Sequence, residues 1–197
     1  MMYDNLSTEL KITGSLVIEK FNTVTQESQT ILVPNAVVAS GKAHIAQRLS
    51  GTTGFTSMGF MGLGTTAAAA TTGTNPALGT EIASANYAPT SGATAAGTVR
   101  KALTGTAWAA QSGTAPIWLQ ANGNVVVYTC TFPAFAYATT YPTGVATVAI
   151  TEAAIFNWDG VTSAAAGGNQ MLAWTTFGTV TKTPVDAITI TWNITIN

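Results

Sequence analysis

The segment that decides the fold is the last one in the chain, DAITITWNITIN, which runs from Asp186 to Asn197. Large apolar residues occupy every second position from Ile188 to Ile196, and polar residues, mostly threonine, occupy the positions between them. Because successive side chains of a strand point to opposite faces, this spacing places one apolar face against a core. We therefore predict a strand over residues 186–197 that has one buried face.

The same two-residue period recurs earlier in the chain. Leu10, Ile12, Leu16 and Ile18 share one parity, and an apolar run resumes from Thr30 to Val33. Two such runs predict an antiparallel hairpin, and Pro34 is expected to end its second strand. Further strands are expected at residues 58–64, 117–119, 125–132, 145–156 and 171–180, with a tight turn at Asn122-Gly123. So many strands joined by short turns favour an antiparallel β-sandwich.

One segment has helical periodicity instead. Its apolar face is predicted to consist of Val38, Ile45, Ala46 and Leu49. Asn35 can cap the helix and Gly51 can end it, so the helix is expected over about residues 35–50. Gly41 is small enough to permit a close approach to a neighbouring element. A shorter helical turn is expected to begin at Pro76, where Leu78 and Ile82 would anchor it.

Stretches of glycine, alanine and threonine separate these elements. Residues 67–74 are almost wholly alanine and threonine, and residues 87–114 are dominated by small side chains. Loops of this length inside one domain are uncommon unless they are functional or ordered by a partner. The predicted organisation is an N-terminal arm over residues 1–9, followed by a single all-β domain over residues 10–197. That domain is an antiparallel β-sandwich with one short helix and long Gly/Ala/Thr-rich loops.

The charge content is unusually low. Charged residues make up 8% of the 197 residues, and seven Lys and Arg against eight Asp and Glu give a net charge of −1, whereas about 25% charged residues is typical. This balance offers no electrostatic attraction for nucleic acid or for an anionic membrane. No apolar run has transmembrane length, and the N-terminus lacks a signal-peptide pattern, so we expect no membrane partner and synthesis in the cytoplasm. A surface so poor in charge is weakly protected against self-association.

Four residues merit consideration for chemistry, and none predicts a site. His44, the only histidine, is expected to be either a surface residue or a hydrogen-bonded structural one, and Cys130, the only cysteine, is expected to be a small buried hydrophobe. Glu152 and Asp159 could form an acid–base pair. However, Glu152 is expected at a strand bend and Asp159 precedes Gly160 in a turn. We therefore assign no catalytic, cofactor-binding or metal-binding residue and expect no enzymatic activity.

The order of several short motifs resembles a known family. These motifs are VVASGKAHIA (37–46), MGLGTT (61–66), LGTEI (78–82), Arg100-Lys101, YTCTF (128–132), ITEAAIF (150–156) and ITITW (188–192). In this order they resemble a family of small virion structural proteins of tailed bacteriophages, over nearly the whole chain from about Ala36 onward. The resemblance implies a non-enzymatic particle component located in the virion. It carries over no functional residues.

Three functions are consistent with these observations. The first is a capsid cement or decoration protein that binds the outer face of the head, stabilises neighbouring capsid subunits and works as a homo-oligomer, a trimer or dimer. Its partners would be the major capsid protein or other virion proteins. The second is a tail, baseplate or fibre-attachment component, which would be present in far fewer copies. The third is a carbohydrate-binding module, which requires aromatic residues and carboxylates in one groove.

Overall fold

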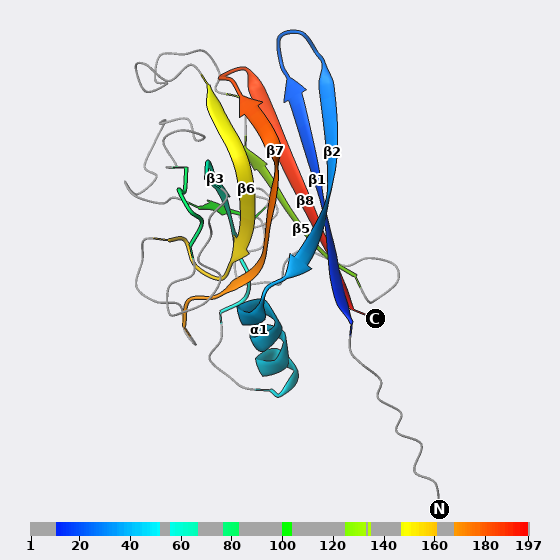
Figure 1. The fold of residues 1–197 in the computed structure, drawn as a ribbon, viewed down its shortest axis with the longest axis vertical. Helices are drawn as coiled ribbons and strands as arrows, with labels where there is room; N and C mark the ends of the chain where they lie inside the picture. Colours follow the sequence, from blue (N-terminus) through cyan, green and yellow to red (C-terminus); the bar gives the residue numbers. More distant parts are fainter. Residues whose placement is uncertain are drawn as a thin grey trace, which may run out of the picture.

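The computed structural model describes residues 11–51, 56–66, 77–82, 100–103, 125–132, 134, 147–160 and 168–196. These residues form two antiparallel sheets with one short helix, and the predicted all-β sandwich is confirmed (Figure 1). The arm over residues 1–9, the strand at 117–119 and the Asn122-Gly123 turn lie outside the described residues.

The strands follow one continuous order that folds over into two layers. The elements are β1 (Ile12–Asn22), β2 (Ser28–Val37), α1 (Ala39–Leu49), β3 (Phe60–Gly64), β4 (Lys101–Ala102), β5 (Val125–Phe132), β6 (Val148–Phe156), β7 (Met171–Lys182) and β8 (Asp186–Ile196). Sheet A has the order β2-β1-β8-β5, and sheet B has the order β7-β6-β3-β4. Strand β2 joins the sheets, because it pairs with β1 over most of its length and with β7 only at Ala36 and Val37.

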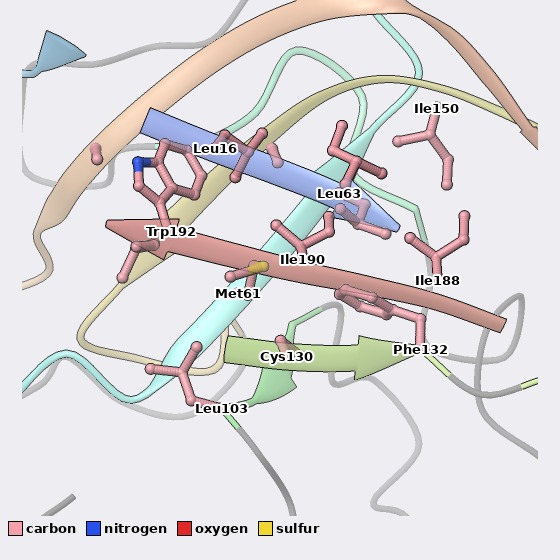
Figure 2. Close-up of a cluster of buried hydrophobic side chains, with 14 of the residues drawn as sticks. Leu16, Met61, Leu63, Leu103, Cys130, Phe132, Ile150, Ile188, Ile190 and Trp192 are labelled. Atoms are coloured by element: carbon pink, nitrogen blue, oxygen red, sulfur yellow. The ribbon is translucent and has the colours of Figure 1, made fainter. Parts of the chain in front are cut away.

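Strand β8 lies in the middle of sheet A, between β1 and β5. Its inward residues Ile188, Ile190, Trp192 and Ile194 are at most 2% exposed. Figure 2 shows Ile188, Ile190 and Trp192 packed with residues of β1 and β5, and against Met61 and Leu63 of sheet B; Ile194 belongs to the same core cluster. Since each such side chain contributes roughly 1.5–3 kcal/mol on burial, this strand supplies a large part of the core energy, as its alternation predicts.

The start of the helix differs from the prediction. Strand β2 continues through Pro34 to Val37, and α1 begins at Ala39 with Val38 as an extended N-cap that makes no side-chain cap bond. The predicted strand end at Pro34 and the predicted cap at Asn35 are therefore wrong. At Pro34, β2 has a strand partner on one side only, because β7 joins it from Ala36 onward. A missing N–H is tolerated at such an edge position.

The buried face of α1 also differs from the predicted one. Gly41 and His44 are buried, whereas Leu49 is 75% exposed. The reason is the close approach predicted at Gly41: a Cβ atom there would lie 2.0 Å from the carbonyl oxygen of Leu172 in β7. This backbone contact decides how α1 is rotated, so the small residue faces the sheet and Leu49 faces solvent.

The helical turn predicted after Pro76 is not observed in residues 77–82. Glu81 instead forms a bridge with Gly64, and the amide of Ile82 donates a 2.8 Å hydrogen bond to the carbonyl of Leu63. Leu78 and Ile82 are buried as expected, but they belong to a non-helical segment that bends at residues 79–80 and is bridged to β3 at Glu81. Backbone bonding to the sheet thus overrides the local capping signal.

Candidate functional site

His44 has a structural environment. It is 5% exposed, and its Nδ1 is hydrogen-bonded to Oε1 of Gln170. Gln170 in turn donates through Nε2 to Oε1 of Gln47 at 3.1 Å, so the pair joins α1 to the start of β7. Burial lowers the pKa of His44 below its usual range, and the bond to Gln170 opposes this only in part. A neutral, hydrogen-bonded imidazole fits the structural role, one of the two expected for it.

Cys130 is fully buried in β5 among the core side chains (Figure 2). Burial raises the pKa of its thiol to about 12. Its Sγ lies 3.6 Å from the carbonyl oxygen of Ala102, the only hydrogen-bond acceptor recorded for it in the described part of the chain. A protonated and inaccessible thiol is a poor nucleophile, so Cys130 serves as the small buried hydrophobe that its strand position predicts.

The carboxylate of Glu152 has a structural role. Glu152 is fully buried, and the pairing of β6 with β7 shifts its register between Ile150 and Glu152, where the sequence predicted a bend. Its Oε1 accepts a 2.8 Å bond from the backbone amide of Gly79, and its Oε2 accepts a 2.8 Å bond from Nε1 of Trp174. Asp159 follows the end of β6. The bonds of Glu152 hold residues 77–82 against sheet B, and each of its two carboxylate oxygens accepts a hydrogen bond within the fold.

Arg100 forms a buried ion pair that was not predicted from the sequence. The Arg100 guanidinium is 2% exposed, donates to both carboxylate oxygens of Glu81 at 2.6 and 3.2 Å, and stacks 3.3 Å from the ring centroid of Phe156. The ring of Trp158 lies 4.5 Å away. The only signal in the sequence is a single arginine at the end of a stretch of small residues, and no neighbouring residue indicates which side chain it pairs with. We call these four residues the arginine clasp.

The end of the sandwich formed by the β1–β2 hairpin and the β7–β8 turn is polar. Burial favours a raised pKa for Asp186, but hydrogen bonds from Thr183 and an ion pair with Lys20 at 3.1 Å outweigh it and lower the pKa. Lys182 is 1% exposed, and burial lowers its pKa to about 8 despite the charge of Asp186 nearby. Strand parity alone does not predict that the ammonium group of Lys182 is buried.

Replacing Lys182 with methionine is expected to stabilise the protein at pH 7 by about 1–3 kcal/mol. Methionine keeps the volume and removes a charge whose burial is costly. The pKa of Lys182 is lower in the folded protein than in the unfolded chain, where it is 10.5. The advantage of the methionine variant is therefore complete below about pH 8 and disappears as the pH rises toward 10.5.

Urea denaturation of both proteins at pH 7, 8, 9 and 10 measures this difference. Cys130 has the opposite effect on the pH dependence of stability. Its pKa is raised in the folded protein, so the free energy of unfolding falls as the pH rises above about 9. Both proteins contain Cys130, so this contribution cancels in the difference between them. Lys42→Met, on the exposed side of α1, is the control and should give no pH-dependent difference. A constant difference across this range would contradict the assignment to Lys182.

A carbohydrate-binding site would need aromatic residues and carboxylates in one groove, and two cavities can be compared with that requirement. One of about 420 Å³ lies at the polar end and is lined by Lys20, Asn22, Glu27, Ser28, Gln29 and Asp186. The other, of about 220 Å³, lies between α1, β5 and β8; Tyr128 and Ile194 are in its mostly apolar wall. Carboxylates thus line one cavity and an aromatic ring the other. Neither of these two cavities has the combination that the carbohydrate-binding alternative requires.

The outer face of sheet A is a broad surface of partly exposed and exposed residues. Its residues alternate with the buried core positions and lie in register across four strands: Thr30, Leu32 and Pro34 of β2; Thr13, Ser15, Val17 and Glu19 of β1; Thr189, Thr191, Asn193 and Thr195 of β8; Val125, Val127, Thr129 and Thr131 of β5. None of them is buried. We call this surface the threonine face.

The threonine face is nearly free of charge. Glu19 is the one ionisable residue among its members, and Leu32 is 74% exposed. Hydroxyl groups pair across the strands, between Thr131 and Thr189 at 3.0 Å and between Thr129 and Thr191 at 3.5 Å. Cross-strand threonine pairs stabilise a sheet by a few tenths of a kcal/mol up to about 1 kcal/mol, and here they also hold the exposed side chains in a regular array.

Over the described part of the chain, α1 is too short to cross a membrane, and His, Cys, Asp and Glu side chains do not gather into a group of three that could hold a metal ion.

Comparison with protein-family models, with curated proteins and with solved structures found no match to this chain.

Proposed function

We propose that this protein is a non-enzymatic structural component of a bacteriophage virion, specifically a capsid cement or decoration protein. It would bind the outer face of the head and stabilise neighbouring capsid subunits. The motif order described above motivates the phage assignment. The observation that carries the mechanism is the threonine face, a broad, ordered and nearly uncharged surface suited to contact with another protein subunit.

The described ionisable side chains support a role in structure. His44, Glu152, Arg100 and Asp186 each have partners within the fold that hold one element against another. Ionisable groups engaged in this way stabilise the fold, which suits a virion subunit, because the role of such a subunit depends on its shape and its contacts.

Binding through the threonine face would rest on hydrogen bonds and apolar contacts. Since Glu19 is the one ionisable residue of this face, added salt should change the binding affinity little. Contact through this face with a second copy would give a homo-oligomer, a dimer or trimer, that matches the local symmetry axes of a shell. The major capsid protein or other virion proteins are the proposed partners of that oligomer.

Copy number in purified virions tests this proposal. Quantitative mass spectrometry of the particles, with the major capsid protein as internal reference, should find the protein in hundreds of copies. Its removal should lower the temperature at which the heads release DNA. A few dozen copies, found only in isolated tails, would favour the tail or baseplate alternative. Absence from the particle would refute both versions.

A further inference from the structure

We propose that the threonine face of one copy packs against the same face of a second copy about a two-fold axis. This inference rests on the proposed role as a virion subunit and names the partner for that surface. Sheet A of each copy would then have its own core on the inner face and sheet A of the other copy on the outer face.

The chemistry of the face favours its own copy as the occupant. A hydroxyl group both donates and accepts hydrogen bonds, so a row of threonines is complementary to an identical row. The row of Leu32, Val17, Thr191 and Thr129 crosses all four strands near the middle of the face and presents two apolar and two hydroxyl side chains. A two-fold contact places identical patches together, which suits a surface that is complementary to itself.

The distribution of charge agrees with a second copy rather than a charged partner. No cation lies among the members of the threonine face, so an acidic surface would find no counter-charge there, and Glu19 is its single anion. If the two-fold axis runs across the strands through the Leu32 row, two sheets about 10 Å apart place the two Glu19 residues roughly 17 Å from each other. This exceeds the Debye length of about 8 Å at physiological salt.

The size of the face sets the expected affinity. With the two-fold axis through the Leu32 row, four strands about 4.8 Å apart and three rows about 6.8 Å apart face their counterparts over a projected area of roughly 400 Å². The relief of the side chains adds to this area, which stays below the lower limit of about 600 Å² per partner for stable specific interfaces. We therefore expect a reversible dimer whose dissociation constant is micromolar, and whose population depends on concentration.

Sedimentation velocity of the full chain from about 1 to 100 µM measures this association. The wild-type protein should shift from monomer to dimer over this range. Thr191→Lys, at the centre of the face, should remain monomeric and should lower the thermal melt in dilute solution by no more than about 4 °C, whereas Ala46→Lys, on the exposed side of α1, should dimerise like the wild type. A wild-type monomer at 100 µM, a trimer, or undiminished dimerisation of Thr191→Lys would overturn the proposal.

Crosslinking locates the contact with a matched pair of sites. Leu32 and Leu49 are 74% and 75% exposed, one on the threonine face and the other on α1. A short bis-maleimide should join Leu32→Cys into covalent dimers at least ten times faster than Leu49→Cys, and the buried Cys130 should not react in the folded protein. Equal rates at the two sites would place the contact elsewhere and overturn the proposal.

The two proposals fail separately. A dimer through the threonine face that is absent from virions would refute the virion role and leave the interface standing. A protein abundant in virions but monomeric in these assays would refute the interface alone.

Discussion

Replacing Ile190 with aspartate is expected to abolish folding of the soluble protein. Ile190 is 1% exposed in the central strand β8 and belongs to the main core cluster. The change removes a core side chain, which costs about 2–5 kcal/mol, and buries a carboxylate with no cation beside it, which costs several kcal/mol more. Their sum is comparable to a typical total stability of about 5–15 kcal/mol.

Thr191→Asp is the matched control, because it introduces the same residue at the next position on the opposite face of β8. Its side chain stays in contact with solvent in the monomer, so the loss should be below about 1 kcal/mol. Circular dichroism and urea denaturation in dilute solution measure both variants. An Ile190→Asp protein that melts like the wild type would contradict the placement of this strand on the core.

Replacing Arg100 with alanine should destabilise the protein by about 3–5 kcal/mol. The substitution leaves the carboxylate of Glu81, which is 11% exposed, without its cation, and removes the guanidinium that stacks on Phe156. Breaking one partner of a buried ion pair has a cost of this size because the remaining charge stays poorly solvated. Urea denaturation of the variant gives the loss directly.

A conservative variant, a control variant and a double variant test how charge and geometry contribute to the arginine clasp. Arg100→Lys keeps the charge but loses the two-pronged bond and the planar stacking, so an intermediate loss of about 1–3 kcal/mol is expected. Arg48→Ala, at an exposed position of α1, should stay within about 0.5 kcal/mol of the wild type. In addition, Arg100→Met combined with Glu81→Gln should lose less than the sum of the two single changes. Additive losses would show that the two side chains are not coupled.

The uncharged character of the threonine face and the buried character of β8 have one origin in the sequence. A strand with period two determines both faces at once, so Ile190 and Thr191 are assigned together. For this reason the proposed dimer and the stability of the monomer are tested by substitutions at adjacent positions, with opposite expected outcomes for folding and for association.

Local alternation was sufficient to predict the strand at residues 186–197, the hairpin of β1 and β2, the strand containing Cys130, and the all-β class. Each of these follows from the direction of neighbouring side chains, a property that extends over only a few residues. The close approach at Gly41 was likewise predicted from residue size. The partner of Gly41, Leu172, was not, because it lies far away in the sequence.

Tertiary structure decided where α1 begins, which of its faces is buried, and the non-helical course of residues 77–82. In each case backbone contact with β3 or β7 outweighed capping and propensity signals, whose effects are about 1 kcal/mol. It also decided that Arg100 meets Glu81, nineteen positions away, and that Lys182 is buried beside Asp186. The threonine face depends on register between four strands from distant parts of the chain. Register between distant strands arises only when the whole core packs, so no local pattern contains it.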